Sequence, residues 1–222
     1  MDASVIQVPV ALDLSAIVVG AVLGGAIAVR HRMAVTGVIV LAVTTGLGGG
    51  LIRDTLLQQG TPIALTDRLY LIVTFVAAGF AFFFARAIER FTGVLIALDA
   101  LALGFFTLVG AERAQLVGLP DVGIVFVGVA AATGGAMVMD LLVGEVPEML
   151  RPGVINAMAS IVGAISFVVM TELEVPRSLT QALTIVITAG LRWLALWRNW
   201  HAPVPLDVVA MVRRRRPGER LD

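Results

Sequence analysis

A segment of this chain repeats itself 86 residues further along, and this duplication constrains the fold more than any other feature of the sequence. Each copy contains a glycine cluster followed by an aspartate, and both lie within an apolar stretch. The first copy reads Gly-Leu-Gly-Gly-Gly-Leu-Ile-Arg-Asp at 46–54, and the second reads Ala-Thr-Gly-Gly-Ala-Met-Val-Met-Asp at 132–140. The same offset pairs Asp13 with Asp99, which two unrelated segments would seldom do. We infer that one unit was duplicated.

The composition requires a lipid environment. Hydrophobic residues make up 59 % of the 222 residues, charged residues make up 14 %, and the mean hydropathy is +0.97. Soluble domains carry about 25 % charged residues, so this chain has too few to cover a soluble surface. It is predicted to be an integral membrane protein.

Seven apolar windows are long enough to be membrane-crossing helices, which need roughly 20 residues each. They are Val5 to Val29, Met33 to Leu57, Leu69 to Ala85, Phe91 to Ala111, Val122 to Val143, Pro152 to Thr171 and Ser178 to Trp197. The windows are apolar on every face, whereas the strands of a membrane barrel alternate apolar and polar residues. The predicted fold class is all-α, with seven transmembrane helices.

The arginines predict the orientation of this bundle. With the N-terminus outside, eleven arginines fall in inner loops and the tail, against three (Arg68, Arg113 and Arg177) in outer loops. Basic residues favour the cytoplasmic side, so the C-terminus is predicted to be cytoplasmic in a prokaryotic inner membrane. Arg192, near the end of the seventh window, is expected to extend towards the lipid headgroups.

Three helices in each unit give the duplication a geometry. An odd number of crossings makes the second unit enter the membrane from the opposite face, which predicts an inverted repeat. The expected organisation is a first repeat at 1–90, an inverted second repeat at 91–175, a seventh helix at 176–200 and a cytoplasmic arginine-rich tail at 201–222. Inverted repeats are typical of transporters and related permeation folds, whose pathway lies at the repeat interface.

Glycines weaken one helix in each repeat. A glycine inside a helix costs about 1 kcal/mol relative to alanine, so Gly48, Gly49 and Gly50 favour a break or kink in the second helix. Gly134 and Gly135 do the same in the fifth helix. Backbone groups that a break releases are tolerated in a membrane only inside protein or along a wet cavity, which predicts a pathway here. Close helix packing through small residues is the alternative.

Acidic residues inside the apolar windows are candidate functional residues, because a charge at the centre of a membrane helix costs at least about 2.5 kcal/mol. Asp13 and Asp54 are expected in the outer half with Arg53, and Asp99 and Asp140 in the inner half. Asp13 has a simpler alternative role near a helix start, where acids are favourable. Arg53 is either an ion-pair partner or a pathway residue.

Enzyme and nucleic-acid functions are not favoured. The chain has no cysteine and two histidines, His31 and His201, both in expected loop or tail segments, so no catalytic or metal-binding set is expected. The tail carries four consecutive arginines, Arg213, Arg214, Arg215 and Arg216. Beside a cytoplasmic helix end, these arginines are expected to contact anionic lipid rather than nucleic acid, or to act only as a topology signal.

These motifs resemble those of the prokaryotic trimeric intracellular cation channels, a family with two copies of one glycine-rich domain. The resemblance is carried by Gly-Gly-Gly-Leu-Ile-Arg-Asp at 48–54, by Leu-Asp-Ala-Leu-Ala-Leu-Gly-Phe-Phe-Thr-Leu-Val-Gly-Ala at 98–111, and by 134–147 with its closing Gly-Glu-Val-Pro, and it spans about 10–195. It implies a homotrimer of seven-helix protomers without a cofactor. Each protomer would have its own pore at the kinked second and fifth helices.

One departure from the family pattern concerns charge. Family members commonly keep an arginine before the aspartate in both repeats, but Met139 stands in that place in the second repeat here. We therefore expect the inner acids to have no cation of their own, which would make the inner vestibule more negative and favour cations. The Asp140→Asn substitution should then lower cation flux.

Two transport functions remain open. A channel for monovalent cations, expected to be potassium, would pass ions down their gradient. A secondary transporter of a small solute such as glycine would saturate, and intramembrane acids would suit its proton coupling. Apolar helices of small residues with few polar groups suit a narrow path for an ion, which favours the channel.

Overall fold

The computed structural model describes residues 10–90, 92–150 and 156–198 of the chain, and their secondary structure is all helical. The helices are α1 (Val10–Arg30), α2 (Val35–Leu57), α3 (Ile63–Thr66), α4 (Arg68–Arg90), α5 (Thr92–Leu116), α6 (Asp121–Leu142), the short 3-10 helix η1 (Glu148–Leu150), α7 (Asn156–Glu172) and α8 (Arg177–Trp197). The arginine tail, including Arg213 to Arg216, lies outside the described residues.

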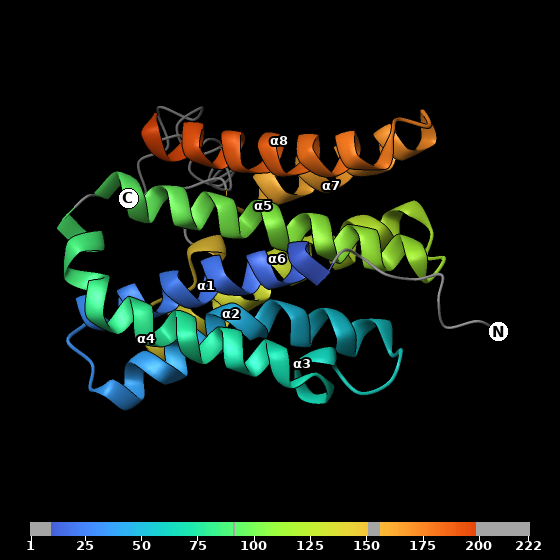
Figure 1. Cartoon of the computed structure of the whole chain (residues 1–222). Helices are drawn as coiled ribbons and strands as arrows, with labels where there is room; N and C mark the ends of the chain where they lie inside the picture. Colours follow the sequence, from blue (N-terminus) through green and yellow to red (C-terminus); the bar gives the residue numbers. More distant parts are fainter. Residues whose placement is uncertain (1–9, 91, 151–155, 199–222) are drawn as a thin grey trace, which may run out of the picture.

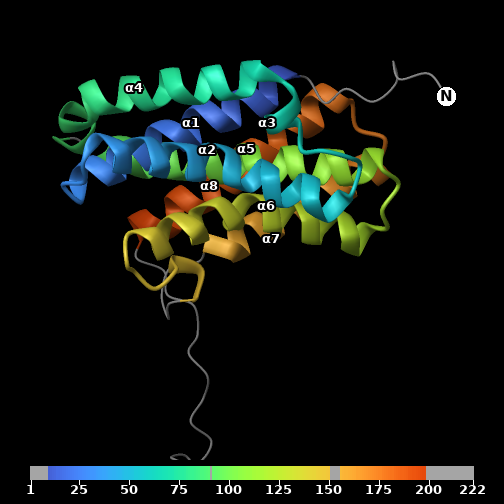
Figure 2. The same ribbon diagram turned by 90° about the horizontal axis from the view of Figure 1, so that it is seen from below.

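The long helices form a bundle with α1, α2, α5 and α6 at its centre. α1 packs against α2, α4 and α5, and α2 packs against α6. Figure 1 shows α7 and α8 along one side of the bundle and α4 along the opposite side. The view from below in Figure 2 confirms this arrangement, with α4 and α7 at opposite edges.

Six helices in the described part of the chain are long and apolar enough to cross a membrane: α1, α2, α4, α5, α6 and α8. The apolar helix α7 is shorter, at 17 residues. Large apolar side chains face outward, among them Phe83 on α4, which is 79 % exposed, and Trp197 on α8, which is 71 % exposed. Such a surface is suited to lipid, which confirms the prediction of an all-helical membrane protein.

Threonine hydroxyls are satisfied within their own helices. Thr45, Thr107 and Thr188 each donate from Oγ1 to the carbonyl oxygen four residues earlier, at 2.7 to 2.8 Å. A hydroxyl group buried in an apolar interior needs such a partner. These threonines therefore belong to the helix packing and need no ligand to explain them.

Two expectations about individual helices are wrong. α2 and α6 run without interruption through their glycine clusters, so the helix break expected there does not occur, whereas a kink in these helices stays a prediction. α5 continues to Leu116, five residues beyond the predicted window, and places Arg113 on a helix instead of in an outer loop. The charged pair at 112–113 obscured the continuation of this helix, because apolar windows are recognised by the absence of charge.

Candidate functional site

A buried ion-pair cluster surrounds Asp13 in the first turns of α1. Arg53 of α2 donates from Nη1 to Asp13 Oδ1 at 3.0 Å, and both residues are 1 % exposed. Asp13 Oδ2 accepts hydrogen bonds from Arg113 Nη2 and from the Tyr70 hydroxyl, each at 3.0 Å. A buried carboxylate is stable only with such partners. Asp13 therefore joins α1 to α2, α4 and α5.

Asp54 extends this cluster to the loop after α2. Its Oδ1 accepts a hydrogen bond from Arg53 Nε at 2.8 Å, and its Oδ2 accepts one from the backbone N–H of Ile63 at 3.0 Å. Arg53 thus lies between two aspartates. We call Asp13, Arg53, Asp54, Tyr70 and Arg113 the Arg53 cluster; its two acids and two arginines balance in charge.

A second cluster surrounds Arg192 of α8, which is 2 % exposed. Arg192 donates from Nε to Asp99 Oδ2 at 2.7 Å and from Nη2 to Glu148 Oε2 at 2.6 Å. The backbone N–H of Glu148 donates to Asp140 Oδ2 at 2.8 Å. We call Asp99, Asp140, Glu148 and Arg192 the Arg192 cluster; it contains three acids and one arginine.

The Arg192 cluster corrects two expectations. The acids of the second repeat do have a cation, since Arg192 pairs with Asp99 directly. Arg192 also does not extend to the lipid headgroups, because its guanidinium is buried among carboxylates. Burying a carboxylate without a cation is costly. Met139 cannot provide this cation, and Arg192 of α8 provides it instead.

Corresponding aspartates of the two repeats make corresponding contacts. Asp13 and Asp99 each accept a hydrogen bond from a buried arginine. Asp54 and Asp140 each accept one from a backbone N–H at the start of the next short helix, α3 or η1. Asp54 and Asp140 therefore each fix the loop that follows their helix. This structural role does not require a permeant ion.

The glycine clusters allow α2 and α6 to touch backbone to backbone. A Cβ atom added to Gly48 would lie 3.1 Å from the Cα of Gly135, and one added to Gly135 would lie 3.1 Å from the backbone nitrogen of Gly49. A Cβ on Gly49 would collide with the carbonyl oxygen of Ala131. We call this contact of Gly48, Gly49 and Gly135 the glycine crossing.

The other two glycines of the clusters have different surroundings. A Cβ on Gly134 would collide with the side chain of Ile52, whereas a Cβ on Gly50 would lie 3.7 Å from Arg53 Nη2 and meet no closer atom. Gly134 therefore belongs to the close packing of α2 with α6. Gly50 leaves space beside the guanidinium of the Arg53 cluster.

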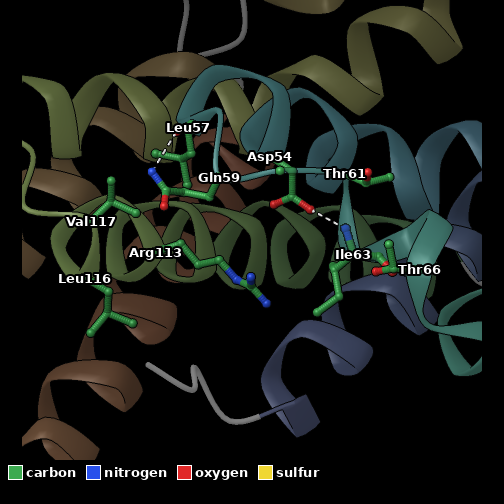
Figure 3. A pocket seen from close by; sticks show the side chains of 10 residues that line it. Asp54, Leu57, Gln59, Thr61, Ile63, Thr66, Arg113, Leu116 and Val117 are labelled. Atoms are coloured by element: carbon green, nitrogen blue, oxygen red, sulfur yellow. Dashed lines mark hydrogen bonds between the residues drawn. The ribbon is translucent and has the colours of Figure 1, made fainter. Parts of the chain in front are cut away.

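Two cavities lie at opposite ends of the central helices. The Asp54 cavity, of about 290 Å³, is lined by Asp54 and Arg113, and Figure 3 shows these two side chains extending into it from α2 and α5. The Asp140 cavity, of about 520 Å³, is lined by Asp99, Met139 and Asp140, together with Glu145 and Glu148. On α5, Asp99 and Arg113 are 14 residues apart, or roughly 21 Å along the helix.

The Asp140 cavity is the more acidic of the two. Besides its four carboxylates, it is lined by Arg30 and by His31, whose Nε2 lies 3.8 Å from Glu145 Oε1. Burial raises the pKa of the Glu148 carboxyl above its ordinary value, although Arg192 opposes this effect. Met139 lines this cavity at the position where Arg53 stands in the first repeat.

The structure brings together the residues that the sequence predicted, and it adds partners that the sequence analysis missed. Asp13, Arg53 and Asp54 meet as expected, but Tyr70, Arg113, Glu148 and Arg192 were not expected in the clusters. A charge inside an apolar window was the signal that identified the aspartates. The same signal is present at Arg192, but its position near a helix end favours the interpretation that the side chain extends to the lipid headgroups.

Family comparison explains the duplication. A family model described as glycine transporter matches this chain twice, at residues 10–86 and 96–172. A membrane protein of the UPF0126 group from Deinococcus radiodurans is 35 % identical over 190 residues, which cover 85 % of this chain and 87 % of the relative. The inner membrane protein YadS of Escherichia coli K12, of the same group, is 30 % identical over 195 residues, which cover 87 % of this chain and 93 % of the relative.

Solved structures of TRIC channels have the same fold as this chain. The orthologue of the TRIC trimeric intracellular cation channel from Rhodobacter sphaeroides is 33 % identical, with a TM-score of 0.80 over 85 % of this chain and 97 % of that one. The chain belongs to the prokaryotic TRIC channel family. A second TRIC cation channel, solved to explain conductance, is 32 % identical and has a TM-score of 0.80 over 90 % of this chain and 98 % of that one. These neighbours are ion channels, so the chain belongs to a family without enzymatic activity.

Proposed function

We propose that this member of the TRIC family is a channel for monovalent cations, with potassium as the main permeant ion and no cofactor. The observation that carries the proposal is the pair of cavities at opposite ends of the central helices, each lined by an aspartate of one repeat. The relatives solved as TRIC channels conduct cations, and the similarity covers most of both chains.

The proposed pathway runs between the two cavities inside one protomer, with the glycine crossing as its narrowest part. At this crossing the backbones of α2 and α6 touch, so α2 and α6 must separate before an ion can pass. A glycine-lined contact can open with little side-chain rearrangement, because no side chain has to leave the path. Asp54 and Asp140 would attract cations to the two mouths.

The assembly that supports this function is a homotrimer of protomers with seven membrane-crossing helices, in which α7 is the additional short crossing. Two repeats at 1–90 and 91–175, inverted relative to each other, precede the seventh helix at 176–200 and the tail at 201–222. The two matches of the family model support the duplication. The N-terminus lies outside and the arginine tail lies in the cytoplasm, where it contacts anionic lipid.

Purified protein in liposomes tests the proposal. An imposed membrane voltage should drive potassium flux that rises without saturation as potassium concentration increases. Gly135→Val, which places a branched side chain in the glycine crossing, should abolish this flux. Gly79→Val on α4, where an added Cβ meets no atom within 4 Å, is the matched control and should conduct normally.

A secondary transporter of glycine is the alternative, and the description of the matching family favours it. Such a transporter would show saturable glycine uptake that depends on a proton gradient. This result, in the absence of potassium conductance, would reject the channel.

A further inference from the structure

A histidine lines the more acidic end of the proposed pathway. His31 follows the end of α1 and lines the Asp140 cavity. It is one of two histidines in the sequence, and the other, His201, lies outside the described residues. Histidine is the side chain that ordinarily changes its charge between about pH 5 and pH 8. The charge of this cavity can therefore change near neutral pH.

The backbone fixes His31 at the end of α1. The N–H of Met33 donates to the carbonyl oxygen of Ala28 at 3.0 Å. The N–H of Arg32, which has a φ of 55°, donates to the carbonyl oxygen of Val29 at 2.8 Å. These two bonds form a Schellman motif, which closes the C-terminal end of a helix. The place of His31 at the cavity is therefore set by the end of the helix and not by a long loop.

Glu145 is fixed in the same way after α6. Its N–H donates to the carbonyl oxygen of Asp140 at 2.9 Å. The N–H of Gly144, which has a φ of 79°, donates to the carbonyl oxygen of Leu141 at 3.1 Å. His31 Nε2 lies 3.8 Å from Glu145 Oε1. The two side chains therefore connect the α1 side of the Asp140 cavity to its α6 side.

The charged residues around His31 are mostly acidic in the part of the chain that the structure describes. Arg30 is the arginine that lines the cavity beside it. Carboxylates line it from α5, α6, η1 and the segment before η1: Asp99, Asp140, Glu145 and Glu148. Each of these carboxylates has another partner, so none depends on His31. A proton on His31 therefore adds a positive charge that the other pairs do not cancel.

This added charge acts mainly through the electric field at the end of the pathway. The side chains of His31 and Glu145 are 33 % and 45 % exposed, and exposed ion pairs contribute little to stability. One unit charge at a partly hydrated opening changes the local concentration of a monovalent cation about two- to fivefold. The residues that line the Asp54 cavity include no histidine, so the effect belongs to one end of the pathway.

We propose that His31 is a proton sensor at the Asp140 cavity and that its protonation lowers the entry of cations. The neutral imidazole leaves the carboxylates of the cavity to attract cations. The imidazolium repels cations and pairs with Glu145 from the opposite side of the cavity. This regulation rests on the proposed channel function and deepens it, with acid on one side of the membrane as the signal.

Planar bilayers in which each side is acidified separately, at low ionic strength, test the proposal. The potassium conductance of the wild type should fall about two- to fivefold between about pH 8 and pH 6 on one side and stay constant on the other. His31→Gln should bring the ratio of the two conductances near one. His31→Arg should also give a ratio near one, at a lower conductance than His31→Gln, because its charge is permanent. His201→Gln removes the other histidine and should keep the wild-type ratio.

A labelling measurement without ion flux separates this proposal from the channel function. The sequence has no cysteine, so Val143→Cys places a single thiol in the Asp140 cavity. The ratio of its reaction rates with a cationic and a neutral methanethiosulfonate reagent reports the charge of the cavity, because the pH dependence of the thiol cancels. This ratio should fall about two- to fivefold between about pH 8 and pH 6. Adding His31→Gln should remove the fall.

The two measurements separate the failure of the sensor from the failure of the channel. Labelling that follows pH through His31, in a protein that conducts no potassium, would support the sensor and reject the channel. A wild-type labelling ratio that is constant with pH would overturn the sensor. A fall in conductance and in labelling that persists in His31→Gln would assign the effect to carboxylates such as Glu148 and would also overturn it.

Discussion

Arg192 Nε lies 2.7 Å from Asp99 Oδ2. The charge of Asp99, in the first helix of the second repeat, is therefore neutralised by α8, a helix outside both repeats. In the first repeat the corresponding acid, Asp13, pairs with Arg53 of its own repeat. α8 lies beyond the second match of the family model, which ends at residue 172. The second repeat has Met139 where the first repeat has Arg53, and Arg192 of α8 supplies the positive charge instead.

The first prediction concerns the stability of this pair. Arg192→Gln should lower the free energy of unfolding by about 3 kcal/mol, because it leaves Asp99 and Glu148 without their cation. Their partial exposure keeps the loss at the low end of the range for buried pairs. Thermal unfolding in detergent measures it, with Arg198→Gln at the exposed end of α8 as the control.

A double-mutant cycle separates this pair from general packing. Asp99→Asn combined with Arg192→Gln should be less destabilising than the sum of the two single substitutions, because each single change leaves a charge alone. Additive losses would show that the two residues do not interact.

The sequence predicted most of the fold because its strongest signals are local. Long apolar windows gave α1, α2, α4, α6 and α8 nearly in place, and an intramembrane charge was enough to select Asp13, Asp54 and Asp140. The end of α5 was missed because Glu112 and Arg113 interrupt the apolar pattern, although each pairs with a residue that is distant in the sequence.

The contacts between residues that are distant in the sequence could not be predicted from it. Arg192 and Asp99 are 93 residues apart, and their contact depends on how α8 packs against α5. The uninterrupted course of α2 has the same origin: the cost of its glycines is offset by their close contact with α6, which no property of α2 alone predicts.

A second prediction concerns the charge of the Asp140 cavity. Asp140→Asn keeps an oxygen that can accept from Glu148 N–H but removes one negative charge from the mouth. Potassium flux in liposomes should fall severalfold at low ionic strength and less at high salt, because salt screens the attraction. Asp121→Asn, an exposed acid at the opposite end of α6, is the matched control. Equal flux in both variants would show that Asp140 serves only to fix the loop.

A third prediction concerns pH. Burial raises the pKa of Glu148 above its ordinary value of 4.5, so the folded chain binds more protons than the unfolded chain just above that pH. The contribution of Glu148 to the free energy of unfolding should therefore decrease as pH rises through this interval. Thermal unfolding should be measured from about pH 4 to pH 7. The free energy of unfolding should decline less steeply with rising pH for Glu148→Gln than for the wild type. Glu172→Gln should follow the wild type.

A fourth prediction concerns the glycine crossing. Gly135→Ala places a Cβ 3.1 Å from Gly49 N and 3.2 Å from Thr45 O, where backbone atoms have little room to move. It should destabilise the chain by about 1–3 kcal/mol, as expected for overpacking. Gly79→Ala has open space and should instead stabilise α4 by up to about 1 kcal/mol, since alanine favours helices. Opposite signs in thermal unfolding separate close contact from helix propensity.

The last prediction asks whether the two arginine positions are interchangeable. Met139 lines the Asp140 cavity together with Asp99, and it corresponds to Arg53, which holds Asp13 in the first repeat. Met139→Arg should therefore recover part of the stability that Arg192→Met loses, because a guanidinium from α6 replaces the one from α8. The same added charge lies directly in the proposed cation mouth, so potassium flux should fall even as the Tm rises. Val143→Arg, which adds the same charge in the same cavity but directly after the end of α6, is the control for position. If Val143→Arg restores the Tm equally, the rescue reflects net charge and the repeats are not equivalent at these positions.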